Sequence, residues 1–465
     1  MNTLEFATTL DASPEAVFRW HARPGAFERL VPPWAPVRLE RVDGIGEGDR
    51  AVLRLGPGPL ALRWVAEHHD VVEGRQFCDR QVQGPFAHWD HTHRFEPTEE
   101  GGCRLVDRIE YALPAGGLGA AAGPVLVEPE LRRQFAYRHR VTRRDLALHR
   151  RYDAEGAPLT VAVSGASGLV GSQLVPFLTT GGHTVRRLVR SGPVAEDEIL
   201  WDPASGVVEA DKLEGVDAVI HLAGESVFGP WTAAKKRRIH DSRTEGTRLL
   251  ADALAGLEDP PSTFVSASAV GYYGDRAADV VTEDTPSGDG FLAAVCRAWE
   301  AATAPAAEAG IRTVQARIGV VLSPAGGALR GQWPLFWLGL GGTVGRPDQY
   351  VPWIALDDVV GGLYHLLMEE GLAGPVNLTA PAPAPMGRYA ETLGTVLGRP
   401  TPLRVPPAVL RGLLGEMAEE MALKSARVVP VRLRGDGYTF GHPDLEGALR
   451  HVLGRSRPDD GATEM

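Results

Sequence analysis

The chain has 465 residues, of which 44% are hydrophobic and 23% are charged, and its formal net charge is −11. This composition is typical of a soluble globular protein, and the length exceeds what a single hydrophobic core usually holds, so we expect two domains or more. The negative charge disfavours a nucleic-acid-binding protein, and the lack of any apolar run of about 18 residues excludes a membrane span.

The cysteines and the N-terminus both favour a reducing compartment. The three cysteines are scattered and form no CxxC pair, so they predict neither a disulfide framework nor a zinc site: Cys78, Cys103 and Cys296. The N-terminal stretch MNTLEFATTLDASPE carries acidic residues where a secretory signal needs basic ones and an apolar core. We therefore expect a cytoplasmic protein.

The sequence of the first part of the chain predicts a strand, a short helix, a series of strands and a long helix, in that order. Residues 3–9 favour a strand, and Ser13 is placed to cap a short helix with Pro14 at its first position and Glu15 in its first turn. Six β-like runs follow, separated by turns: VRLERV, DRAVLRL, LALRWVAEHHDV, RQFCDRQVQ, HWDHTHRFEP and CRLVDRIEYAL. A long helix that Pro129 could open comes last, with apolar residues at Leu131, Phe135, Val141, Leu146 and Leu148.

This order of elements resembles the helix-grip fold of the START-like, polyketide-cyclase-like (SRPBCC) superfamily, over about residues 3–150. In that α+β fold a curved sheet wraps a long helix around an apolar cavity. The resemblance implies a ligand-binding domain in residues 1–152, with Leu131 and Phe135 in the cavity wall. The domain would present an apolar ligand to the rest of the chain or sense it, and a well-packed core without a ligand is the alternative.

Three histidines in the run FAHWDHTHRF were considered as metal ligands. On a strand, His91 and His93 share one face, whereas His88 points to the other. The spacing shows no third ligand, and polar residues on a half-exposed strand explain the pattern without a metal. We assign no metal from the sequence.

Beyond a polar linker at residues 151–158, RYDAEGAP, strands alternate with helices. Each predicted strand is short and rich in β-branched residues: 159–163, 185–189, 218–222, 263–266 and 313–321. This alternation is typical of a doubly wound parallel sheet, so we expect an α/β domain here.

A glycine turn joins the first of these strands to a helix. Gly165, Gly168 and Gly171 stand three apart, where bare N–H groups and a helix N-terminus can approach a phosphate. A tight turn without a ligand would use such glycines as well. The residues of this turn that we expect at a cofactor are Gly165, Ala166, Ser167, Gly168, Leu169, Val170 and Gly171.

The ends of the next two strands indicate which cofactor would bind. The strand HTVRRLVRSG ends in Arg190 and Ser191, where an NAD site usually carries an acidic residue, and a cation suits the 2′-phosphate of NADP. A solvated basic strand end is the alternative. The strand AVIHLAG ends in Leu222, Ala223 and Gly224, of which the small Ala223 and Gly224 let a cofactor lie against the backbone. We interpret His221 before them as structural.

Several segments in order resemble the extended short-chain dehydrogenase/reductase superfamily, in its epimerase-like branch: WDPASG, LAGESV, SASAVGYYG, CRAWE, GGAL and WIALDD. The resemblance covers about residues 159–453. It implies a Rossmann domain with the glycine turn at the pyrophosphate, Arg190 at the 2′-phosphate and Ser268 as the catalytic serine or threonine.

The usual catalytic tyrosine and lysine are missing from the chain. Aligned on Glu300, the tyrosine place holds Leu292, which has no proton to donate, and the lysine place holds Cys296, which has no positive charge to lower a neighbouring pKa. Tyr272 or Tyr273 could substitute, although GYYG also fits a packed aromatic turn. We expect an NADP-dependent oxidoreductase or epimerase-like enzyme on a small molecule, with a non-catalytic NADP(H) sensor as the alternative.

The predicted organisation is a helix-grip domain (1–152), a Rossmann domain (158–380), a C-terminal substrate or lid region (381–453) and a disordered tail (454–465). In the lid region, an apolar stripe is expected to pack mainly into the core, with part of it as a substrate wall: Val409, Leu410, Leu413, Leu414, Met417 and Met421.

Overall fold

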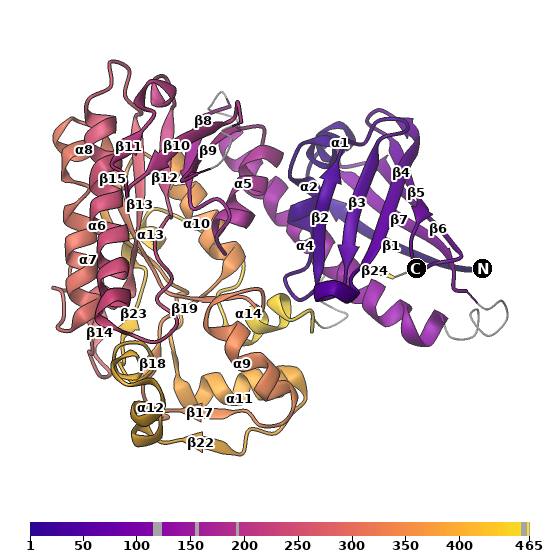
Figure 1. The fold of residues 1–465 in the computed structure, drawn as a ribbon. Coiled ribbons are helices and arrows are strands. Elements are labelled where there is room, and N and C mark those ends of the chain that lie inside the picture. The colour runs from indigo at the N-terminus through magenta and orange to yellow at the C-terminus, as the bar shows by residue number, and fades with distance from the viewer. Residues whose placement is uncertain (115–122, 154–157, 192–194, 457–462, 465) are drawn as a thin grey trace. The chain divides into compact units, whose positions relative to one another are not determined.

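The computed structural model describes residues 1–114, 123–153, 158–191, 195–456 and 463–464 (Figure 1). The chain divides into two compact units. The first consists of Met1–Ala157, Pro176–Gly182 and Leu453–Met465, and the second of Pro158–Val175 and His183–Val452. Every helix among the described residues is too short or too polar to cross a lipid bilayer.

The first unit is built on an antiparallel sheet of order β2-β3-β4-β5-β6-β7-β1-β24. Its strands are β1 (Asn2–Leu10), β2 (Val37–Val42), β3 (Arg50–Leu55), β4 (Leu62–Val72), β5 (Gln76–Gln83), β6 (His88–Pro97), β7 (Cys103–Ala112) and β24 (Thr463–Glu464). Its helices are α1 (Pro14–Ala22), α2 (Ala26–Leu30) and α4 (Glu128–Asp153), with a short 3-10 turn, η1 (Gly58–Leu60). Strand, short helix, meander and long helix confirm the α+β helix-grip fold that the sequence predicts.

Local sequence explains how these helices begin and what they cover. The Ser13 hydroxyl accepts a hydrogen bond from the Ala16 N–H at 3.3 Å, so it caps α1 as predicted. Along α4, apolar side chains pack against the sheet, and the Phe135 ring stacks on Phe6 with ring centroids 4.7 Å apart. Burying one such ring stabilises the fold by about 1.5–3 kcal/mol.

Part of the predicted disordered tail pairs with this sheet. Phe6 and Ala7 of β1 face Glu464 and Thr463 of β24 in an antiparallel register. Residues 457–462 and 465 of the tail lie outside the described residues.

The second unit contains the predicted doubly wound sheet, of order β11-β10-β9-β8-β12-β13-β15-β20. Its strands are β8 (Thr160–Ser164), β9 (Thr184–Val189), β10 (Glu198–Asp202), β11 (Val207–Val208), β12 (Ala218–His221), β13 (Thr263–Ala269), β15 (Arg312–Ile318) and β20 (Gly374–Leu378). All neighbours from β10 to β20 are parallel. The strand order reverses between β8 and β12, which is where open α/β sheets bind their ligands.

Helices accompany this sheet and the smaller strand pairs of the C-terminal region. The helices are α5 (Gly171–Thr180), α6 (Ala233–Ala255), α7 (Phe291–Ala301), α8 (Ala304–Glu308), α9 (Gly327–Trp337), α10 (Leu356–Met368), α11 (Met386–Leu397), α12 (Pro407–Leu414), α13 (Val431–Gly435) and α14 (Leu445–Val452). The short turns are η2 (Ala210–Leu213), η3 (Val270–Tyr273) and η4 (Ala418–Ala422). The small pairs are β14 (Val280–Val281) with β23 (Arg427–Val428), β16 (Val320–Leu322) with β19 (Trp353–Ala355), β17 (Gly342–Val344) with β22 (Leu403–Val405), and β18 (Tyr350–Val351) with β21 (Ala384–Pro385).

One predicted strand is two strands in the structure. The run 313–321 divides at Gly319 into β15, which stays in the large sheet, and β16, which pairs with β19. A side chain at Gly319 would place its Cβ 2.4 Å from the Pro352 carbonyl oxygen, so glycine permits the close approach at which the chain changes partner.

The expected core role of the stripe in the lid region is wrong for most of α12. Leu410 is buried, whereas Val409, Leu413 and Leu414 are 47%, 76% and 42% exposed. The helix is short, so it turns only one apolar residue onto the structure beneath it. Met417 and Met421, which lie beyond α12, are half-buried.

Candidate functional site

The glycine turn lies at the point where the strand order of the large sheet reverses. Gly165 has a φ of +69°, and a Cβ there would lie 2.8 Å from the Leu222 carbonyl carbon. A Cβ at Gly171 would lie 2.2 Å from the Gly165 carbonyl oxygen. The glycines therefore let the loop fold against the chain that leaves β12, while Ser167 and Gly168 remain exposed at its tip.

The other residues of the turn are half-buried and continue into α5. Ala166, Leu169 and Val170 have intermediate exposure, and the Gly168 N–H donates to the Gly165 carbonyl at 2.9 Å. The Ser172 N–H donates to the Gly168 carbonyl, which starts the helical pattern at the loop. The structure thus brings the whole predicted turn to one edge of the sheet.

A buried hydrogen-bond chain holds the two strand ends together. The Ser164 hydroxyl accepts from the Leu222 and Ala223 N–H groups at 3.1 and 3.2 Å. It is left to donate to His221 Nδ1, 2.6 Å away, and His221 Nε2 then donates to the Thr247 hydroxyl at 3.0 Å. Burial lowers the pKa of His221 to about 4. The neutral imidazole therefore links Ser164 to Thr247 and stabilises the sheet edge on which a cofactor would lie.

The basic strand end of β9 contains one arginine free to meet a ligand. Arg186 donates to a backbone carbonyl at 2.7 Å, and Arg187 lies 3.0 Å from the Asp197 carboxylate. Arg190 is exposed and has no partner among the described residues, and Ser191 beside it is also exposed. The side chain predicted to select NADP is thus available to an anion.

A second cation, which the sequence analysis missed, lies beneath the end of β12. A Cβ at Gly224 would lie 3.2 Å from the Arg243 guanidinium carbon. Arg243 donates to the Glu225 carbonyl at 2.9 Å and stacks 5.0 Å from the Trp299 ring. Because Arg243 sits in the middle of α6, no local sequence signal connects it with the glycine turn.

Ser268 lies near the carboxyl end of β13 and already forms a hydrogen bond with a carboxylate. Its hydroxyl donates to Glu300 Oε1 at 2.6 Å, and it is 2% exposed. The Arg317 guanidinium donates two hydrogen bonds of 2.8 Å to the same carboxylate. The serine can still accept a hydrogen bond from a ligand, since only its proton is engaged.

The two tyrosines of η3 have different surroundings. Tyr273 is fully buried; its hydroxyl donates to Asn377 at 2.7 Å and accepts from Arg317 at 2.9 Å. Burial raises the pKa of Tyr273 to about 12. Tyr272 is half-buried, with the Arg317 guanidinium 3.6 Å over its ring, and its hydroxyl has no hydrogen bond among the described residues. Tyr272 is therefore the phenol that a substrate could reach.

The residues at the usual tyrosine and lysine positions face the same turn. A Cβ at Gly271 would lie 3.4 Å from Leu292 and 3.8 Å from the Cys296 sulfur. Burial raises the pKa of Cys296 to about 12, so the thiol stays neutral at physiological pH. Leu292 has no proton to donate in place of the tyrosine, and Cys296 has no positive charge in place of the lysine.

The first unit contains a cavity of about 970 Å³. Its wall is mostly apolar and aromatic and includes Leu131 and Phe135 of α4, as the sequence predicts. Other apolar lining residues are Leu39, Leu53, Ala66, Phe77, Phe86 and Trp89. This volume and lining are typical of sites for drug-sized molecules.

Polar side chains gather on one part of the cavity wall. His21, His68, Asp79, His91, His93 and Arg138 all line it. Behind them, Asp107 bonds His91 Nε2 at 3.1 Å and His139 Nε2 at 2.6 Å. Burial opposes ionisation of Asp79, but the neighbouring His91 and His93 hold its pKa below the usual range. Burial likewise opposes protonation of His91, yet Asp79 and Asp107 raise its pKa to about 9.

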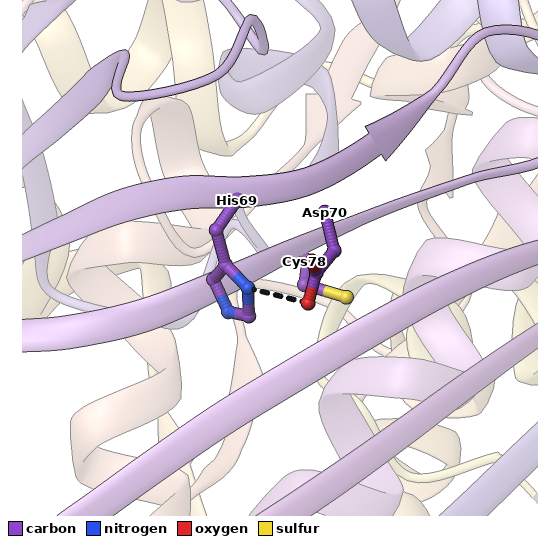
Figure 2. A group of neighbouring side chains, drawn as sticks. All are labelled: His69, Asp70 and Cys78. Carbon is purple, nitrogen blue, oxygen red and sulfur yellow. Dashed lines mark hydrogen bonds and ion pairs between the residues drawn. The ribbon is translucent and has the colours of Figure 1, made fainter.

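On the opposite face of the same strands, His69, Asp70 and Cys78 lie close together (Figure 2). His69 contacts Asp70 at 3.0 Å through Nδ1 and Asp90 at 3.1 Å through Nε2, so both its nitrogens are engaged. Burial raises the pKa of the Cys78 thiol, which donates to the Thr92 hydroxyl. These contacts account for the group without a ligand.

The fold and these two sites define an α/β protein of the dinucleotide-binding type joined to a helix-grip domain. Family models agree: the NAD dependent epimerase/dehydratase family matches residues 161–377, and polyketide cyclase / dehydrase and lipid transport matches residues 1–137. A domain of unknown function matches residues 405–452.

Known proteins place the chain within this class. An epimerase family protein of Mycobacterium bovis is 42% identical over 300 residues, which are 64% of this chain and 99% of the relative. The human epimerase family protein SDR39U1, solved with NADPH, is 33% identical, with a TM-score of 0.59 over 63% of this chain and 99% of the human one. This chain belongs to the NAD dependent epimerase/dehydratase family.

Both units have a counterpart in a single solved structure. A protein of Corynebacterium glutamicum, described as a nucleoside-diphosphate sugar epimerase, is 33% identical and has a TM-score of 0.82. The match covers 98% of this chain and 91% of that one. The joining of a helix-grip domain to an epimerase-type domain is therefore shared.

Proposed function

We propose that this chain binds NADP(H) and acts on a small molecule as an oxidoreductase or epimerase-like enzyme. The observation that carries the proposal is the exposed Arg190 at the carboxyl end of β9. A guanidinium there matches the 2′-phosphate of NADP, whereas NAD sites use a carboxylate to bond the ribose. The human relative solved with NADPH supports the same cofactor.

In this proposal the glycine turn and the N-terminus of α5 bind the pyrophosphate. Backbone N–H groups of the turn and the positive end of the helix favour an anion there. The chain from Leu222 to Gly224 lies along the cofactor, since the small residues Ala223 and Gly224 let the backbone approach it. Ser191 follows Arg190 and adds a hydroxyl beside the same phosphate.

Titration of the protein with NADPH and NADH, followed by fluorescence, tests this assignment. Arg190→Asp is expected to weaken NADPH binding by about 10- to 100-fold and NADH binding far less, because only NADPH loses a charge-assisted contact. Arg388→Asp, at an exposed position of α11, makes the same charge change away from the glycine turn and serves as the control. Equal weakening of both cofactors by Arg190→Asp would contradict the proposal.

For the chemistry, we assign the proton-transferring hydroxyl to Tyr272. The Arg317 guanidinium fixes its ring, and its hydroxyl is free to meet a substrate oxygen. The hydroxyl of an alcohol substrate or product can donate a hydrogen bond to Ser268, while Tyr273 holds the turn in place through Arg317 and Asn377. NADPH oxidation over a panel of aldehydes, ketones and quinones tests the assignment.

A non-catalytic NADP(H)-binding sensor is the second candidate, favoured by Leu292 and Cys296 at the usual tyrosine and lysine positions. The same substrate panel separates the two functions. Turnover that disappears in Tyr272→Phe supports the enzyme. Cofactor binding without turnover of any carbonyl compound supports the sensor.

We further propose that the cavity of the first unit binds an apolar ligand, because its wall is predominantly apolar and aromatic. Ala66→Trp would fill part of the cavity, since Ala66 is a small residue of its wall. This variant is expected to lose the binding of an environment-sensitive lipophilic dye to the full chain. Leu60→Trp, at a position 85% exposed, adds the same ring outside the cavity and should leave dye binding intact.

A further inference from the structure

We propose that Asp79, His91 and His93 bind a divalent transition-metal ion, zinc or ferrous iron, in the wall of the first unit's cavity. Two imidazoles and one carboxylate form a donor set used for both ions in sites that keep open positions. The site is separate from the nucleotide site, so the inference does not rest on NADP(H) binding.

Strand pairing brings the three side chains together. In the antiparallel pair β5–β6, Asp79 lies directly opposite His91. His93 follows two residues later on the same face of β6. The sequence analysis found no third ligand because Asp79 is on the neighbouring strand, twelve positions before His91 in the numbering.

The distances between the donor atoms fit a metal's coordination shell. Asp79 Oδ2 lies 3.1 Å from His91 Nδ1 and 3.6 Å from His93 Nε2. All three donor atoms lie within 4.8 Å of one another. With metal–ligand bonds of about 2.1 Å, neighbouring donors in a tetrahedral or octahedral shell are about 3.0–3.4 Å apart. Small side-chain rotations would complete the site.

A second carboxylate orients both imidazoles from behind. Asp107 Oδ1 lies 3.1 Å from His91 Nε2 and 2.7 Å from His93 Nδ1, so it faces the nitrogens that a metal would not use. Asp107 Oδ2 also bonds His139 Nε2 at 2.6 Å. A carboxylate on the far nitrogen of a metal-binding histidine fixes its orientation and raises its basicity.

The proposed donors face the cavity, whereas the supporting groups do not. Asp79, His91 and His93 line the cavity; Asp107 and His139 are buried and do not. Three protein donors leave coordination positions open toward the cavity, where an oxygen atom of a bound molecule can reach the ion. The ion would supply Lewis acidity to that oxygen. The cavity's ligand is therefore inferred to have an apolar body and one oxygen-bearing end.

Two other groups in the described residues are weaker candidates. The group in Figure 2 includes Asp70, whose side chain is 73% exposed, and none of its three residues lines the cavity. In the second unit, His451 Nε2 is bonded to Asp357 at 2.6 Å, with the His442 ring stacked 4.1 Å away. Neither group combines a cavity with a supporting carboxylate.

The test uses the full chain without an affinity tag, treated with chelator and then titrated with Zn²⁺, with Fe²⁺ under anaerobic conditions, and with Co²⁺ as a spectroscopic probe. We expect about one equivalent of metal, at least tenfold weaker binding in His91→Ala/His93→Ala, and unchanged binding in His69→Ala. Asp107→Asn keeps all three donors and is expected to weaken binding by about 10- to 100-fold.

Circular dichroism and urea unfolding establish that each variant is folded. If the double variant does not fold, Co²⁺ absorption bands in the native chain and their response to Asp107→Asn decide the matter. The inference is overturned if folded native protein binds none of the three ions at micromolar concentration. It is also overturned if either His91→Ala/His93→Ala or Asp107→Asn binds metal as tightly as the native chain. In those cases the cluster is an ion-pair network that stabilises the sheet.

Discussion

Replacing Tyr273 by Phe is expected to destabilise the second unit without removing its chemistry. The change deletes one hydroxyl that makes two buried hydrogen bonds, to Asn377 at 2.7 Å and from Arg317 at 2.9 Å. Each such bond contributes about 1 kcal/mol, and Arg317 keeps the Glu283 carbonyl as an acceptor at 3.2 Å. The free energy of unfolding should therefore fall by about 2 kcal/mol.

The neighbouring tyrosine provides the matched comparison. Tyr272→Phe removes a hydroxyl without a hydrogen bond among the described residues and keeps the ring beneath the Arg317 guanidinium, so its stability should stay within about 0.5 kcal/mol of native. Its kcat should fall by about 100-fold or more, as expected for loss of a general acid. Urea unfolding and NADPH oxidation measure both effects. A Tyr273→Phe variant that keeps native stability but loses turnover would refute the assignment.

Two further expectations follow from the sheet edge. Gly171→Ala places a Cβ 2.2 Å from the Gly165 carbonyl oxygen, so NADPH affinity should fall at least tenfold by fluorescence titration; Gly331→Ala, with no atom within 4 Å of its Cβ, is the control and should leave affinity unchanged. His221 has a folded-state pKa of about 4 against an ordinary 6.5, so the stability that depends on its neutral form is present above pH 6.5 and is lost as the pH falls toward 4. Urea unfolding should show a loss of up to about 3 kcal/mol across that window, and His221→Gln should reduce it; an unchanged pH dependence in the variant would contradict the buried neutral state assigned to His221.

The sequence predicted what depends on neighbours along the chain. The Ser13 cap, the meander, the long helix and the glycine turn are all set by short-range patterns, and the structure contains each of them. Family resemblance supplied the role assigned to Ser268, and the basic strand end supplied that of Arg190; both remain predictions.

What the sequence missed depends on contacts between distant segments. Glu300 of α7 accepts the hydrogen bond of the Ser268 hydroxyl, and Arg243, in the middle of α6, lies against Gly224. Asp79 joins His91 only through strand register. The α12 stripe has helical spacing, but periodicity alone cannot tell whether an apolar face is covered. Each miss is a tertiary contact with no local signal.

The order of strands in the first unit also bears on how its sheet assembles during folding. Strands β2 to β7 pair with their neighbours in sequence, so each new hairpin closes only a short loop and forms early. Strand β1 pairs with β7 at the other end of the meander, which requires a much longer closure. Asp79, His91, His93 and Asp107 lie on β5, β6 and β7, so we expect these polar groups to come together before the sheet is complete. In that order of assembly these groups meet while water can still reach them, and we expect them to lose that water only when β1 and α4 close the domain.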